Sequence, residues 1–198
     1  MKKLIVFLIS AVTAFFCIPA FSQTNLIGPP IGLEWGMSYS EAKTLLKSKG
    51  IEIEDLKEDK KYKLPKGFKV AKVGKYEILN RKTEINLACF NADGELCSFQ
   101  INFRWFKDKE KALVFYEKEL KKAFYGKYSG EGFKEHKDPS PEGNIPAFAF
   151  RDEVGNEVGV YHQDQKTLLG DAFWILVYYN NEEILKATRK QQKATDEI

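Results

Sequence analysis

The sequence is poor in the residues that most often build metal and nucleophilic sites. Its 198 residues include two histidines, His136 and His162, and three cysteines. A histidine-based zinc site needs further ligands at helical or hairpin spacing, and neither histidine has one. There is no Gly-x-Ser-x-Gly motif, and residues 155–161 lack the lysine and the following helix of a phosphate-binding loop. The sequence therefore shows no signature of an enzyme, and we expect neither a metal nor another cofactor.

Long apolar runs are missing after the first segment of the chain. Residues 1–22 combine a positive start at Lys2 and Lys3, an apolar stretch, and small residues before Gln23. This order predicts a secretory signal peptide that is cleaved. A lipoprotein is disfavoured, because Cys17 follows a bulky phenylalanine instead of a small residue. No later stretch reaches the roughly 18 apolar residues that span a membrane, so we expect a periplasmic or secreted protein without a transmembrane span in the mature chain.

Neither sign of charge dominates the chain. Loss of Lys2 and Lys3 would reduce the 31 basic residues to 29, against 28 acidic residues. Nucleic-acid binding needs a basic surplus, so nucleic acid is not expected as a partner. A local surplus occurs at residues 57–82, which hold ten lysines and arginines. A solvated lysine-rich loop is favoured there over an anionic-ligand site.

The segment GLEWGMSYSEAKTLLKSKG, residues 32–50, predicts a short capped helix. Ser38 followed three residues later by Glu41 forms a capping box. Apolar residues then recur at helical spacing, and Gly50 suits a left-handed C-terminal cap. The remaining conspicuous residue, Trp35, is expected to anchor the lead-in segment, residues 23–31, against the core.

Residues 84–105, EINLACFNADGELCSFQINFRW, predict a β-hairpin with alternating apolar positions. A three-residue loop would pair Asn91 with Glu95. The same register places Cys89 opposite Cys97, with both side chains facing the core. An oxidising compartment would permit a disulfide between them, but α-carbons are widely spaced at such a hydrogen-bonded pair. A disulfide and two buried thiols both remain open.

The rest of the sequence predicts a second helix and further strands. Asp108 suits the N-cap of a helix that runs to Tyr125, with apolar residues at helical spacing. Residues 182–198 are expected to form a short helix and a frayed tail. The expected strands besides the hairpin cover residues 68–73, 76–79, 145–150, 157–163 and 171–179.

Together these elements predict an α+β fold in which helices pack on one face of an antiparallel sheet, in one domain over residues 23–181. The spacing at the start of the first helix recurs seventy residues later. A duplication would divide the domain into tandem helix-plus-sheet units, 31–104 and 105–181, although four matched positions also arise by chance. The matched positions are Trp35, Ser38, Ala42 and Leu46, and then Trp105, Asp108, Ala112 and Tyr116.

The stretch GLEWGMSYSEAKTLL resembles the start of many small bacterial envelope proteins. Its hydrophobic-Trp-Gly lead into a capped helix, followed by an antiparallel meander, is similar in layout to the outer-membrane assembly lipoprotein BamE. It is also similar to the secreted beta-lactamase inhibitor proteins, which are two tandem helix-plus-sheet repeats. The pattern covers mainly residues 31–50, and it implies a non-enzymatic, partner-binding envelope protein. The chain lacks a convincing lipidation cysteine and a recognisable inhibitory loop, so the function of neither family transfers.

The strand DAFWILVYY, residues 171–179, is the main candidate for a binding surface. One of its faces carries Trp174, Leu176 and Tyr178, and Tyr161 would extend that face. A strand buried on both sides gives the same pattern, whereas an exposed aromatic face marks a recognition site. The sequence therefore predicts a non-catalytic binding protein that recognises a protein or an envelope component. It does not specify the oligomeric state.

The alternative is an enzyme or small-ligand binder whose site is assembled near His162 from residues distant in sequence. A pocket with convergent polar groups beside His162 would favour this alternative, and a flat aromatic face would favour the binding protein.

Overall fold

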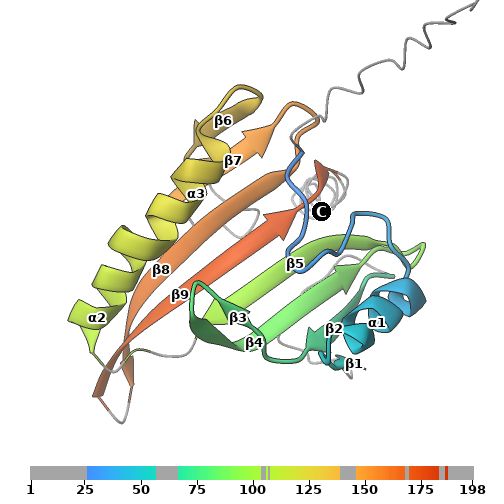
Figure 1. Ribbon diagram of the computed structural model, residues 1–198, viewed down its shortest axis with the longest axis horizontal. Coiled ribbons are helices and arrows are strands. Elements are labelled where there is room, and N and C mark those ends of the chain that lie inside the picture. The colour runs from blue at the N-terminus through green and yellow to red at the C-terminus, as the bar shows by residue number, and fades with distance from the viewer. Residues whose placement is uncertain are drawn as a thin grey trace, which may run out of the picture.

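The computed structural model describes residues 26–56, 67–103, 106, 108–138, 146–167, 170–182 and 186. Its nine-stranded antiparallel sheet and the helices on one face confirm the predicted α+β class (Figure 1). The expected signal peptide, Trp105 and nearly all of the terminal helix and tail lie outside the described residues. Within these residues, no helix is long and apolar enough to cross a membrane.

A short helix opens the fold, and a longer one follows the fifth strand. The first helix is α1 (Tyr39–Ser48), and the longer one runs without a break through α2 (Lys109–Val114), the π-helical η1 (Phe115–Leu120) and α3 (Lys121–Tyr128). The strands are β1 (Ile53–Asp55), β2 (Lys69–Val73), β3 (Glu77–Ile78), β4 (Arg81–Phe90), β5 (Leu96–Phe103), β6 (Phe133–His136), β7 (Phe148–Asp152), β8 (Glu157–Thr167) and β9 (Gly170–Asn180).

The sheet joins two consecutive halves of the chain. Its strand order is β1-β2-β4-β5-β9-β8-β7-β6, and β3 pairs with β4 outside this path. Each half consists of a helix followed by strands, and the last strands of the halves, β5 and β9, pair with each other at the centre. Isolated bridges also precede both helices, Ser38 with Glu95 and Phe106 with Phe173. A duplicated unit would produce such an order, and the duplication itself stays a prediction.

Helix α1 forms where its sequence predicts it. The Ser38 hydroxyl accepts a hydrogen bond from the Glu41 amide at 3.3 Å, and the Glu41 carboxylate accepts one from the Ser38 amide at 2.8 Å. The predicted capping box is therefore confirmed. Gly50 follows the helix with φ +71°, the left-handed conformation that glycine adopts without strain.

Replacing Ser38 by alanine is expected to lower the free energy of unfolding by about 1 kcal/mol, because a capping side chain is lost. Urea unfolding followed by circular dichroism measures the change. Ser40→Ala is the matched control, since Ser40 is exposed just inside the same helix. Equal effects of the two substitutions would contradict a role for the cap.

The lead-in segment connects the start of the fold to the end of β7. The indole N–H of Trp35 donates to the carbonyl oxygen of Ile27 at 2.7 Å, which anchors the lead-in. The Ile27 amide donates in turn to the Asp152 carboxylate at 2.7 Å, and Ile27 is fully buried. Asp152 also accepts a hydrogen bond from the Asn156 amide at 2.8 Å. One buried carboxylate thus closes the β7–β8 turn and fastens the lead-in.

The β4–β5 hairpin has the predicted loop but a different register. The Asn91 amide donates to the Glu95 carbonyl at 2.8 Å, as expected for the three-residue loop. The register then shifts between Cys89 and Phe90, so that Cys89 lies opposite Ser98. The prediction that Cys89 faces Cys97 is wrong, because a β-bulge inserts one extra residue and reverses which side chains share a face.

The bulge changes what surrounds the two cysteines. Leu87 pairs with Gln100, and Ala88 pairs with Phe99 on the core face. Cys89 and Cys97 are buried thiols that form no disulfide with each other, and Cys97 Sγ donates to the Cys89 carbonyl at 3.3 Å. They form a small separate cluster with Phe68 and Val70.

The long helix and two strands differ from the sequence prediction. The helix starts after its predicted cap, where the Lys111 amide donates to the Asp108 carboxylate at 3.1 Å. It extends past the expected end at Tyr125 to Tyr128, and it contains an unpredicted π-helical segment. Strands β1 and β6 were also not predicted. Both are short and lie at the edges of the sheet, where little apolar patterning is needed.

Candidate functional site

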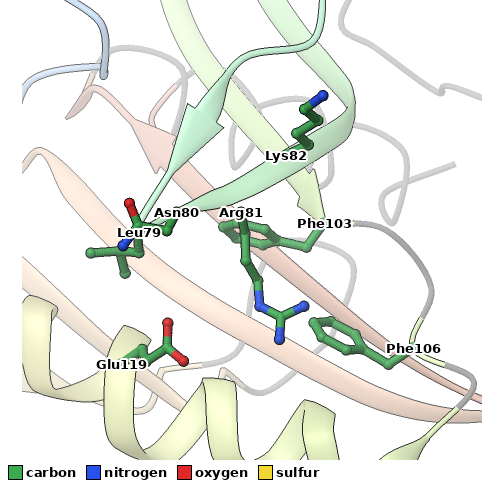
Figure 2. A pocket seen from close by; sticks show the side chains of 7 residues that line it. All are labelled: Leu79, Asn80, Arg81, Lys82, Phe103, Phe106 and Glu119. Carbon is green, nitrogen blue, oxygen red and sulfur yellow. The ribbon is translucent and has the colours of Figure 1, made fainter.

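A cavity of about 620 Å³ lies between the β3–β4 turn and the long helix (Figure 2). This volume falls within the range of about 300 to 1,000 Å³ that is typical of small-molecule sites. The cavity is lined by Leu79, Asn80, Arg81, Lys82, Phe103, Phe106 and Glu119.

The tight turn between β3 and β4 forms one wall of the cavity. Ile78 pairs with Arg81, which leaves Leu79 and Asn80 as the two turn residues. Both have positive φ, +50° and +58°. Asparagine tolerates this conformation, whereas a branched apolar residue such as leucine is strained there. The turn holds a leucine at the cavity in spite of this cost, a type of strain that often accompanies functional sites.

Arg81 lies against two aromatic rings, Phe106 and Phe115, which also stack on each other with ring centres 5.9 Å apart. Its guanidinium carbon lies 4.6 Å from the ring centre of Phe106 and 4.5 Å from that of Phe115. Phe115 also contacts Phe103 edge-on, with ring centres 5.0 Å apart. Among the described residues, no acceptor forms a hydrogen bond or ion pair with this guanidinium. Arg81 is therefore a positioned cation whose N–H donors remain available to a ligand.

Glu119 enters the same space from the opposite element. Figure 2 shows its carboxylate and the Arg81 guanidinium pointing into the cavity from the helix and from β4, while Lys82 points away. Glu119 lies in η1, and its side chain is exposed. Single π-helical turns inside α-helices occur frequently at functional sites.

The cavity has the chemistry of recognition. A planar guanidinium forms strong paired hydrogen bonds to carboxylates. The lining residues do not pair a nucleophile with a base. No group of three or more potential metal ligands occurs among the described residues.

The aromatic face predicted on β9 is only partly exposed. Leu176 and Tyr178 are 8% and 4% exposed, so they offer little contact surface. Trp174 and Tyr161 are half-buried, and the rings of Tyr161 and Tyr178 stack at 4.9 Å. Partial exposure on this face is therefore confined to Trp174 and Tyr161 among its four predicted members.

His162, the centre of the alternative prediction, lies on the helix side of β8. Its exposed ring contacts Tyr116 edge-on at 4.8 Å and stacks on Phe173 at 5.4 Å. The cavity described above is lined by other residues. The structure therefore does not bring His162 into the site around Arg81.

A polar cluster on the other face of the sheet was missed by the sequence analysis. Glu157 on β8 lies 2.7 Å from Arg151 Nη2 and 3.1 Å from His136 Nε2, although the latter contact lacks good hydrogen-bond geometry. Asp138 contacts Arg151 at 3.2 Å. The side chains of His136 and Glu157 are 8% and 9% exposed. These contacts join β6, β7 and β8, and they therefore stabilise this edge of the sheet.

The environment of Glu157 favours its ionised form. Burial by itself raises the pKa of this carboxyl group, but the contacts with His136, Arg151 and the Tyr178 hydroxyl outweigh burial and lower the pKa to about 2. Tyr178 lies beside this carboxylate, and burial together with the negative charge raises the pKa of its hydroxyl. At neutral pH the cluster therefore holds a carboxylate beside a neutral phenol.

Comparisons with protein-family models, curated proteins and solved structures found no match for this chain. The geometry around Arg81 is therefore the basis for assigning a function.

Proposed function

We propose that the protein is a non-catalytic binding protein of the bacterial envelope, periplasmic or secreted, which recognises a protein or envelope component through a carboxylate bound at Arg81. The observation that carries this proposal is a guanidinium held against the rings of Phe106 and Phe115 with no acceptor among the described residues. A pre-positioned cation at the wall of a cavity has the properties of a carboxylate receptor.

The aromatic rings prepare Arg81 for binding. Stacking limits the rotamers of the side chain before the ligand arrives, which reduces the entropy lost on binding. The partly buried location also strengthens the interaction, because fewer water molecules compete for the N–H donors. Hydrogen bonds to charged groups contribute about 1.5 to 3 kcal/mol each.

Removing the charge of Arg81 is expected to weaken carboxylate binding strongly. Isothermal titration with 3-phenylpropionate should detect a complex that its neutral amide does not form. Arg81→Gln should weaken the binding of 3-phenylpropionate at least tenfold, which corresponds to about 1.4 kcal/mol. Lys118→Gln, at an exposed position of the long helix outside the cavity lining, is the control and should bind normally.

The same titrations test the proposal, and binding to envelope extracts discriminates it from a second candidate site. Equal affinity for the acid and its amide, or no effect of Arg81→Gln, would contradict the proposal. The second candidate is the half-buried pair Trp174 and Tyr161, which is favoured by the stacking of Tyr161 on Tyr178. If Trp174→Ala removes binding to envelope extracts and Arg81→Gln does not, the aromatic face is the recognition surface.

A further inference from the structure

We infer that the cavity takes a zwitterion: a short apolar peptide with both termini free, which places its carboxylate on Arg81 and its ammonium group on Glu119. The inference rests on the proposed function for the carboxylate contact. It adds the second charge, the apolar body and the chemical class of the ligand.

Two unlike charges face this cavity without touching. Arg81 comes from β4 and Glu119 from η1, and both point into the space between the turn and the helix (Figure 2). No ion pair or hydrogen bond between them is present, and neither group has such a partner elsewhere among the described residues. Unlike charges attract each other, and a ligand that carries both charges can pair with the two side chains at the same time.

Glu119 differs in this respect from its neighbour on the same helix. Glu117 forms an ion pair with Lys121, one turn further on, at 3.2 Å. This pairing is the usual arrangement on an exposed helix face. Glu119 belongs to the cavity lining, and its carboxylate remains available to an incoming cation.

The rest of the lining offers a limited apolar surface between the two charges. Leu79 is 36% exposed and supplies most of it, whereas Phe103 and Phe106 are 1% and 8% exposed and add little. The volume of about 620 Å³ is within the range that holds drug-sized ligands. A peptide of two or three apolar residues has this size, and its free termini carry the opposite charges that the two walls require.

Three dipeptide probes separate these contributions. L-Phe-L-Phe carries both charges, N-acetyl-L-Phe-L-Phe carries only the carboxylate, and L-Phe-L-Phe amide carries only the ammonium group. Isothermal titration of the folded full chain with each probe measures the affinities. The free dipeptide is expected to bind about fivefold more tightly than the acetylated form, the range of an exposed ion pair.

Substitutions then assign each charge to its partner. Glu119→Gln should weaken binding of the free dipeptide about fivefold and leave the acetylated form unchanged, whereas Arg81→Gln should weaken both. Glu117→Gln is the matched control, because Glu117 is exposed on the same helix but does not line the cavity. Glu119 is exposed, so its substitution should leave the fold intact, and circular dichroism checks this.

The outcomes distinguish this inference from the proposed function. If the acetylated dipeptide binds as tightly as the free one and Glu119→Gln has no effect, the zwitterion inference is overturned while the carboxylate site at Arg81 stands. If neither carboxylate probe binds, or if the amide is the tightest ligand, both are overturned.

Discussion

Replacing Gly159 by alanine is expected to lower the free energy of unfolding by about 3 kcal/mol, the upper end of the usual cost of overpacking. A Cβ at this position would lie 2.5 Å from Tyr178 Cζ and 2.6 Å from its Cε1, and it would also collide with the hydroxyl oxygen. Tyr178 cannot easily move away, since it is 4% exposed and stacks on Tyr161 at 4.9 Å. The glycine therefore provides the room in which the tyrosine ring lies across β8.

Chemical denaturation of two further variants tests this explanation. Gly126→Ala, in helix α3, meets nothing within 4 Å and should stabilise the protein by up to about 1 kcal/mol. Introducing Gly159→Ala into a Tyr178→Leu background should cost almost nothing, because the colliding atoms are gone. If the full cost persists in that background, the contact with Tyr178 is not its cause.

Acidification is expected to remove about 3 kcal/mol of stability through Glu157. The pKa of this carboxyl group is about 2 in the folded protein, against 4.5 for an unperturbed glutamate. Folding thus favours the ionised form. Its contribution to the free energy of unfolding is fully present above about pH 4.5 and is lost as the pH falls towards 2. A shift of this size corresponds to about 3 kcal/mol.

Thermal unfolding between pH 2 and 7 measures this contribution. Glu157→Gln should be about 3 kcal/mol less stable than the parent at pH 7, and the difference should shrink towards zero near pH 2. Glu153→Gln is the matched control, since Glu153 is exposed in the adjacent turn. Parallel loss of stability in the parent and in Glu157→Gln would place the acid sensitivity elsewhere.

Local sequence signals predicted helix α1 and the overall class well. The capping box of Ser38 and Glu41 and the glycine after the helix act within a few residues, so their chemistry can be read directly from the sequence. The apolar residues of 171–179 likewise predicted the strand β9, whose Phe173 and Ile175 lie in the core. Each of these features depends on neighbours along the chain.

The bulge in β5 could not be predicted in the same way. Leu96 and Cys97 are adjacent and both completely buried, on opposite faces of the sheet. Alternation of apolar and polar residues carries no information where two consecutive residues are apolar. The register was therefore decided by packing on both faces, which depends on distant residues such as Phe68 and Val70.

The candidate site depends even more strongly on residues that are distant in sequence. Arg81 is the last residue but one of the lysine-rich segment 57–82, for which the sequence favoured a solvated loop. Its aromatic partners, Phe106 and Phe115, follow some thirty residues later, and only the fold stacks them on the guanidinium. The Glu157 cluster also depends on a strand that was not predicted, because β6 brings His136 to the carboxylate. Long-range pairing created both features.

The contact between Ile27 and Asp152 sets an order of events in folding. These residues are 125 positions apart in the chain, yet the carboxylate of one holds the amide of the other. During synthesis, helix α1 and the first strands emerge well before Asp152 exists. The lead-in can dock only after β7 has formed its turn, and contacts of such long separation are slow to form. The earliest described residues of the chain can therefore be secured only after Asp152 has been synthesised.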